Sequence, residues 1–216
     1  MQTEDTLAAD DEITPSFNRR NSLRGATDHL HRDLDRITAG FRLGEVGHYR
    51  RFLQANAATL IAIEQLLENA GVATLLPDWQ LRTRRDAILA DLHSLDSQVQ
   101  PLALRRTAPT PPEVFGILYV LEGSRLGARV LLEQVLASDD EQVRNASAYL
   151  RHGQPRQGQS GEDPSLWRSF LQQLETNDAA DDQTQTVSGA VYAFTMFIRS
   201  FGQAATELRL RTAPAA

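Results

Sequence analysis

Apolar residues recur at intervals of three and four positions along most of this chain, and no run of useful length alternates strictly between apolar and polar residues. This spacing places side chains on one face of an α-helix, and a glycine commonly ends such a helix. Near the start of the chain, Gly40 follows a run of this kind, so a helix is predicted over residues 16–39. The apolar positions of that run are Leu23, Leu30, Leu34 and Ile37.

The same pattern predicts an all-α, single-domain bundle of about seven helices. A loop with four prolines is expected over residues 101–112, and a Gly/Gln-rich loop over residues 153–161. The helical domain is predicted to span residues 15–210, between a disordered acidic tail (1–14) and a short C-terminal tail (211–216). The predicted helices are 16–39, 45–69, 78–96, 113–136, 140–151, 163–175 and 182–208.

Composition excludes several classes of function. The chain has no cysteine, which excludes disulfides, thiolate catalysis and cysteine-based metal sites. Its net charge of −6 argues against nucleic-acid binding, and all 22 basic residues are arginine. No segment reaches the about 18 consecutive apolar residues of a membrane span. The acidic N-terminus lacks the pattern of a signal peptide, so a cytoplasmic protein is expected.

Three glycines lie inside the most apolar predicted helix. Gly116, Gly123 and Gly127 are separated by seven and four residues, which places them on one stripe. Each interior glycine costs about 1 kcal/mol relative to alanine, so the stripe costs about 2–3 kcal/mol of helix stability. Two interpretations explain what could offset this cost in helix stability. The glycines either let another helix pack closely, or they expose backbone to a flat ligand.

His31 is the most informative titratable residue of the first predicted helix. It lies at the edge of the apolar face, with Arg24 two turns before it and Asp35 one turn after it. Neutral histidine is the usual protein ligand of heme iron, and an arginine on the same face suits a propionate. Taken alone, a histidine at this place is more often a surface residue or a hydrogen-bonded core residue than an iron ligand.

Common catalytic motifs do not occur in the sequence. There is no HExxH, GxGxxG, P-loop or GxSxG pattern, and no Glu-x-x-His spacing of a di-iron bundle. This disfavours the metal-dependent oxidases that use a similar bundle, and it leaves few catalytic options within known motif chemistry.

Two segments together resemble the helices that enclose heme in heme oxygenases, especially the bacterial branch that produces biliverdin. The first is Leu-Arg-Gly-Ala-Thr-Asp-His-Leu-His-Arg-Asp-Leu-Asp, residues 23–35. The second is Tyr-Val-Leu-Glu-Gly-Ser-Arg-Leu-Gly-Ala-Arg-Val-Leu, residues 119–131. The order and spacing of the helices agree with that family from about residue 18 to 205, and the family implies an all-α fold.

The resemblance implies roles for residues of both segments. His31, in an Ala-Thr-x-x-x-His pattern that includes Thr27, matches the proximal iron ligand, and Arg24 matches a propionate-binding residue. Gly123 and Gly127 match the distal glycines whose backbone lies over heme. The resemblance also places Ser124 where animal members carry an acidic residue that orders water, and Ala128 where many members have a second glycine.

Further along the chain, the resemblance is carried by an arginine and three aromatic residues. Arg168 resembles a second propionate-binding arginine. Phe194, Phe197 and Phe201 resemble the aromatic wall of a heme pocket, although ordinary core packing explains their spacing nearly as well. The absence of lysine leaves the in-plane orientation of heme, and therefore the cleaved position, open.

The activity implied by the resemblance is oxidative cleavage of heme to biliverdin, ferrous iron and CO. Heme would be both substrate and cofactor, together with O2 and electrons from an external donor, either a ferredoxin or a reductase. A biliverdin-accepting photoreceptor is a candidate partner. Arg82, Arg84 and Arg85 form a basic cluster that either docks an acidic donor or is a solvated helix face.

Two other interpretations of the sequence remain. A protein of the same fold could bind heme or biliverdin without turnover. A helical interaction protein could instead use its glycines for packing and bind no tetrapyrrole.

Overall fold

The computed structural model describes residues 18–104, 107–153 and 166–212, and every regular element within these ranges is helical. The predicted all-α bundle is therefore confirmed. Four helices are longest: α1 (Arg19–Thr38), α2 (Val46–Asn69), α5 (Pro111–Leu136) and α9 (Gln183–Thr212). Shorter elements complete the described chain: α3 (Val72–Leu75), η1 (Trp79–Leu81), α4 (Arg85–Ser94), α6 (Glu141–Asn145), α7 (Ala148–Arg151), α8 (Leu166–Thr176) and η2 (Asp178–Ala180).

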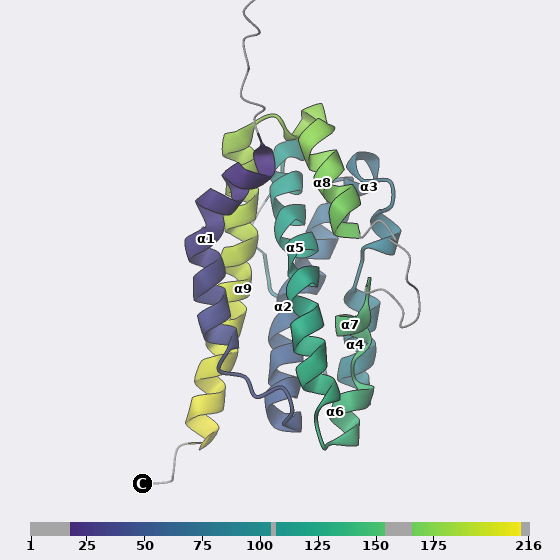
Figure 1. Ribbon diagram of the computed structural model, residues 1–216, viewed down its shortest axis with the longest axis vertical. Helices are drawn as coiled ribbons and strands as arrows, with labels where there is room; N and C mark the ends of the chain where they lie inside the picture. The colour runs from purple at the N-terminus through teal and green to yellow at the C-terminus, as the bar shows by residue number, and fades with distance from the viewer. Residues whose placement is uncertain (1–17, 105–106, 154–165, 213–216) are drawn as a thin grey trace, which may run out of the picture.

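The long helices run roughly along the long axis of the molecule (Figure 1). Helices α1 and α9 lie side by side at one edge, α5 occupies the middle, and α4, α7 and α8 lie at the other edge (Figure 1). Helix α9 packs against α1, α2 and α5, so it joins the two halves of the bundle. No described helix is long and apolar enough to cross a membrane.

Helices α5 and α9 approach each other at two glycines. A Cβ atom on Gly116 would overlap the carbonyl oxygen of Thr186, and a Cβ atom on Gly189 would overlap the carbonyl oxygen of Glu113. Only glycine permits this separation of the two backbones. Close helix packing is therefore the explanation for Gly116.

Two predicted helices are each divided in the structure. The predicted helix 78–96 becomes η1 and α4, because the buried carboxylate of Glu64 accepts hydrogen bonds from the backbone N–H groups of Arg84 (2.8 Å) and Arg85 (3.3 Å). These donors would otherwise be unsatisfied at the start of α4. A side chain distant in sequence thus fixes where the helix begins.

The predicted helix 140–151 becomes α6 and α7 for the same reason. The Asp91 carboxylate accepts hydrogen bonds from the backbone N–H groups of Ala148 and Tyr149, each at 2.8 Å. At the other end of the break, the Tyr49 hydroxyl donates to the Ala146 carbonyl at 2.6 Å. Buried groups of α2 and α4 therefore replace the hydrogen bonds that a continuous helix would make.

The ends of the long helices follow from local sequence. Thr110 and Glu113 form a capping box at the start of α5, and Pro111 occupies its first position. Helix α9 continues to Thr212, beyond the predicted boundary at residue 208. The predicted tail 1–14, residues 213–216 and the loop from residue 154 to 161 lie outside the described residues.

Candidate functional site

A cavity of about 450 Å³ lies between α1, α5 and α9, with α2 behind it. Its size falls in the usual range of small-molecule and cofactor sites. It is lined by predicted site residues of three helices: Arg24, Thr27, His31, Gly123, Ser124, Gly127, Ala128, Phe194, Phe197 and Phe201. Only Arg168, among the predicted site residues, lies outside this lining; it is an exposed residue of α8.

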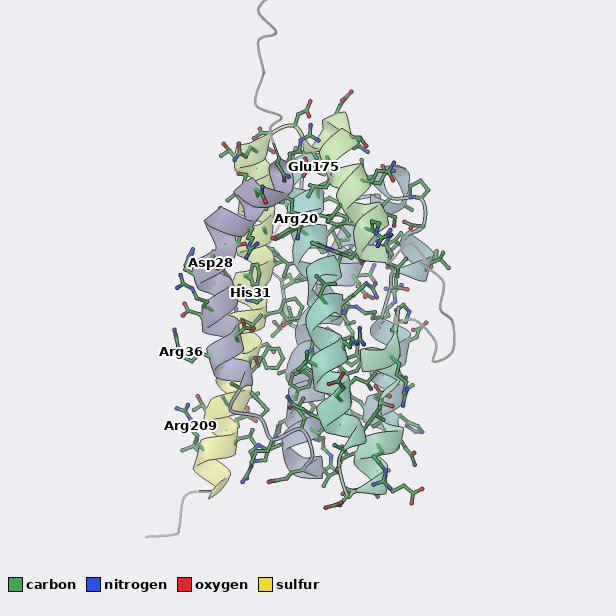
Figure 2. All side chains as sticks on the ribbon, in the orientation of Figure 1. Arg20, Asp28, His31, Arg36, Glu175 and Arg209 are labelled. Carbon is green, nitrogen blue, oxygen red and sulfur yellow. The ribbon has the colours of Figure 1, made fainter. Side chains whose placement is uncertain are left out.

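The α1 wall carries His31. Its Nδ1 atom lies 2.9 Å from a carboxylate oxygen of Asp35, one turn later on the same helix. Because a carboxylate oxygen can only accept, the contact favours a proton on Nδ1, and in the neutral imidazole the lone pair then lies on Nε2. The imidazole side chain is 63% exposed, and its ring meets the ring of Phe194 edge to face, with centroids 6.0 Å apart. In Figure 2, His31 lies on the side of α1 that faces the bundle, whereas Arg36 points away from it.

Thr27 stands one turn before His31 and is buried in the same wall. Its hydroxyl donates to the Leu23 carbonyl at 2.8 Å, so its polar atom is satisfied within α1. The side chain therefore presents its methyl group to neighbouring atoms and contributes shape to the wall.

The α5 wall exposes backbone. A Cβ atom on Gly127 would meet nothing within 4 Å, and one on Gly123 would meet only the Trp167 ring, at 3.7 Å. Packing does not demand these two glycines, in contrast to Gly116. Their absent side chains instead leave the surface of α5 open along the cavity, and Ala128 continues this surface. The glycine stripe thus combines both interpretations: its first member packs a helix and the other two line a cavity.

Ser124 lies on the same wall, between two hydrogen-bond partners. Its hydroxyl donates to the Leu121 carbonyl at 2.7 Å and accepts from an Nη atom of Arg84 at 3.0 Å. The Arg84 guanidinium also donates to the Leu121 carbonyl at 3.0 Å. Arg84 therefore braces α5 directly behind the cavity.

The remaining wall is aromatic. Phe194, Phe197 and Phe201 of α9 are buried and line the cavity together with Phe52 of α2. The rings of Phe52 and Phe201 lie with centroids 5.3 Å apart. These phenylalanines belong to the core and to the cavity wall at once, so the two explanations for their spacing do not exclude each other.

One end of the cavity is cationic. Arg20 and Arg24 line it beside Tyr119 and Trp167, and the Arg20 guanidinium carbon lies 6.0 Å from the centre of the Trp167 ring. Burial raises the pKa of the Tyr119 phenol, and the charges of the two arginines oppose that rise. In Figure 2, Arg20 lies between α1 and α5. Arg20 was not predicted as a site residue, although its spacing of four residues from Arg24 places the two on one face of the helix.

Of the predicted basic cluster, Arg82 and Arg84 are buried and Arg85 is partly exposed, so the cluster is neither a docking surface nor a solvated face. The Arg82 side chain is 0% exposed and donates to a Glu122 carboxylate oxygen at 2.8 Å. Arg125 donates from Nε to the same oxygen at 3.0 Å, and burial lowers the pKa of this guanidinium. Arg85 pairs with Glu68 at 2.5 Å. Periodicity alone gave no sign that an acidic residue of α5 would meet this segment.

A metal cluster built from side chains is not present in the part of the chain that the structure describes. Within residues 18–104, 107–153 and 166–212, no group of three or more histidine, aspartate or glutamate side chains is placed to hold a metal ion. The cavity lining offers one imidazole, exposed backbone, aromatic rings, hydroxyl groups, one carboxamide and two guanidinium groups.

Comparisons with known proteins show which family this sequence resembles. The sequence model of the heme oxygenase family matches residues 18–203. A heme oxygenase of Xanthomonas campestris pv. campestris is 29% identical over 150 residues, covering 69% of this chain and 86% of the relative. Heme oxygenase PigA of Pseudomonas aeruginosa is 29% identical over 200 residues, covering 89% of this chain and 95% of the relative.

A solved structure shares the fold. The NO- and CO-bound heme oxygenase of Neisseria meningitidis superimposes with a TM-score of 0.63 at 18% sequence identity. The match covers 93% of this chain and 96% of that protein.

Proposed function

Because the chain belongs to the heme oxygenase family, we propose that it binds heme in the cavity between α1 and α5 and opens it oxidatively to biliverdin, ferrous iron and CO. The observation that carries the proposal is the pairing of His31 with Asp35 on one wall, opposite the exposed backbone of Gly123 and Gly127. Heme, when bound, supplies the iron that reacts with O2 and is also the substrate that is cleaved.

The residues of the cavity fit a flat, apolar ligand that carries two carboxylates. Phe194, Phe197 and Phe201 offer apolar ring surface, and the cationic end offers Arg20 and Arg24 as partners for the propionates. Arg168, which the family resemblance suggested as a second propionate-binding residue, lies outside the cavity lining. Arg20 is therefore the better candidate for the second propionate. Both arginines are on α1, and the propionates are therefore expected at the end of the cavity nearest Trp167.

His31 would bind iron through Nε2. Its Nδ1 proton is held by the Asp35 carboxylate, which fixes the tautomer and the ring orientation and makes Nε2 a better donor. A neutral imidazole ligand does not push electron density toward O–O cleavage as a thiolate does. A neutral imidazole ligand therefore suits oxidation of the heme macrocycle itself.

The α5 wall would set the space available on the other face of heme. At Gly123 and Gly127 no side chain stands between the backbone of α5 and the cavity, so the backbone itself could face the bound group. The hydroxyl of Ser124 already donates to a backbone carbonyl, so it can offer a lone pair to an ordered water but no free proton. We propose a ferredoxin or reductase as the electron donor and a biliverdin-accepting photoreceptor as a partner for the product.

An absorption titration with hemin tests the function. The wild-type chain is compared with His31→Ala and with His29→Ala, an exposed histidine of the same helix outside the cavity lining. Ascorbate or a reductase is then added under air. We expect a one-to-one complex with a Soret band in the wild type and His29→Ala, a weakened or altered band in His31→Ala, and conversion of the wild-type complex to a product that absorbs in the red.

The other outcomes separate the alternatives. A Soret complex that survives reductant and air unchanged indicates a heme carrier without turnover. If hemin does not bind, the heme function is wrong and a helical interaction protein becomes the better explanation.

A further inference from the structure

An asparagine lies on the α2 wall of the cavity. Asn56 is 8% exposed and lines the cavity near Phe52 and Leu150. The sequence around it is apolar, with Ala55 and Ala57 as direct neighbours. A buried carboxamide presents one oxygen and two N–H donors, and buried polar groups of native proteins are generally hydrogen-bonded.

The oxygen of this carboxamide has a partner that fixes its orientation. The Tyr149 hydroxyl donates to Asn56 Oδ1 at 3.0 Å. The Arg84 guanidinium carbon lies 5.2 Å from the centre of the Tyr149 ring. This cation–π contact helps to hold the Tyr149 ring in place. Asn56 therefore turns Oδ1 toward Tyr149 and its NH2 group away from it.

The nitrogen of the carboxamide has no acceptor within the described ranges of the chain. Asn56 Nδ2 donates no hydrogen bond there, whereas three hydroxyl groups of the same lining do donate. Thr27 and Ser124 donate to carbonyl groups of their own helices, and Tyr149 donates to Asn56. The Asn56 amide therefore offers an N–H donor to the cavity from the α2 wall.

The amide is tied to the α5 side of the cavity. Helix α7, which carries Tyr149, packs against α4 and α5. Arg84, which lies over the Tyr149 ring, donates to the Leu121 carbonyl and to the Ser124 hydroxyl of α5. The Asp91 carboxylate fixes α7 further by accepting from the Tyr149 backbone N–H at 2.8 Å. His31 lies on the opposite helix, α1.

We propose that Asn56 is a positioning residue that donates a hydrogen bond from Nδ2 to a water molecule or small anion on the α5 side of bound heme. Tyr149 holds the amide in the donating orientation. The inference rests on the proposed heme-binding function, and it assigns to α2 and α7 a role that the backbone of α5 alone would not supply. The role of Asn56 can be measured as the affinity of the heme complex for a small anion, which does not require turnover.

Fluoride binding to the ferric heme complex of the full chain tests this role. Fluoride accepts hydrogen bonds strongly, and its binding is followed by absorption. The variants are Asn56→Leu, which keeps the approximate shape without donors, and Tyr149→Phe, which removes the orienting hydroxyl. Gln54→Leu is the matched control, because Gln54 is an amide of α2 that bonds to Ser97 and Gln98 instead of lining the cavity.

We expect Asn56→Leu to raise the fluoride dissociation constant about tenfold, the effect of one lost hydrogen bond to a charged group. Tyr149→Phe is expected to raise it less, and Gln54→Leu to leave it unchanged. Asn56→Gln, which restores a carboxamide, is expected to recover part of the loss.

Unchanged fluoride affinity in an Asn56→Leu protein that still forms the Soret complex overturns the role of Asn56 and leaves the proposed function intact. If the wild type forms no Soret complex with hemin, both proposals fail together. Should Asn56→Leu not fold, Tyr149→Phe decides, since wild-type fluoride affinity in that variant contradicts the orienting role of the phenol.

Discussion

The close contact between the His31 imidazole and the Asp35 carboxylate shows how one side chain can orient another. The two residues are one helical turn apart, so α1 itself brings Nδ1 within 2.9 Å of the carboxylate. Both side chains are well exposed, and the pair therefore contributes little to folding stability. In the proposed function, the contact orients the ring and favours the tautomer with its lone pair on Nε2.

Replacing Asp35 is expected to weaken heme binding. Asp35→Ala removes the acceptor of the Nδ1 proton, and the loss of such a partner typically costs at least about tenfold in affinity for the metal. The hemin dissociation constant, measured from the Soret band, should rise by about that factor. Asp33→Ala is the control, because Asp33 pairs with Arg36 away from the cavity. Equal affinities in the two variants would contradict the role of Asp35.

Two glycines of α5 are expected to respond differently to an added methyl group. Gly116→Ala forces a methyl group against the Thr186 carbonyl of α9 and should lower the free energy of unfolding of the heme-free protein by about 1–3 kcal/mol or more. Gly127→Ala meets no neighbour and should raise it by roughly 0.5–1 kcal/mol, because alanine favours a helix. Urea unfolding measures the free energy of unfolding of both variants. A similar change in the two would contradict the different roles of Gly116 and Gly127.

At the scale of the element, α5 has two faces with different tasks. One face lies along the cavity, and another meets a buried ionic cluster formed by Arg82, Glu122 and Arg125. Arg82 also donates to Asp78, to the Leu166 carbonyl and to Ser169. The segment before α4 and the start of α8 are therefore fastened to the back of the helix that forms the cavity wall.

Removing the acidic member of this cluster is expected to be costly. Glu122→Ala leaves two buried guanidinium groups without their shared carboxylate, which should lower the free energy of unfolding by about 3–5 kcal/mol. Glu133→Ala, an exposed position of the same helix, should change it by less than about 0.5 kcal/mol. Denaturant unfolding followed by circular dichroism compares the two, and a small effect at Glu122 would count against the cluster as a structural tie.

At the scale of the whole molecule, the short elements α4, α7 and α8 are held by buried polar groups from other helices. Glu64 of α2 caps α4, and Asp91 of α4 caps α7. His152, just after α7, lies with Nδ1 3.1 Å from an Nη atom of Arg125. This half of the bundle is therefore sensitive to protonation at its buried groups.

Acid destabilisation through His152 is expected. Burial lowers the pKa of His152, and the neighbouring charges of Arg125 and Arg84 lower it further, while Glu122 acts in the opposite direction. Between this lowered pKa and the unfolded value of about 6.5, the unfolded chain binds more protons. The free energy of unfolding should therefore fall as the pH drops below about 6.5.

The comparison with His152→Gln isolates this contribution. The variant should show a shallower loss of stability between about pH 7 and 5.5, measured by urea unfolding at each pH. Burial raises the pKa values of Glu64 and Asp91, but both groups are present in either protein, so their effects cancel in the difference. Parallel pH profiles would show that His152 does not contribute.

Much of the fold follows from the sequence alone. The long helices α1, α2, α5 and α9 were predicted because three- and four-residue apolar spacing is a local signal, and their glycine, proline and capping residues are local as well. The same spacing placed His31 and Asp35 on one face, and Gly123 and Gly127 on another, without reference to the rest of the molecule. The family resemblance then related these two helices to each other.

Only the tertiary structure decided the features that depend on residues far apart in the chain. Glu64 and Asp91 break predicted helices because they supply hydrogen bonds from elements distant in sequence. Gly116 is distinguished from Gly127 by the backbone of α9, and Arg82 is buried because Glu122 of α5 meets it. Long-range packing also places Arg20 beside Trp167 and joins Asn56 to Tyr149 at the cavity. Sequence periodicity reports which face of a helix is apolar, but the burial of a polar group depends on partners that only the packed bundle brings within hydrogen-bonding distance.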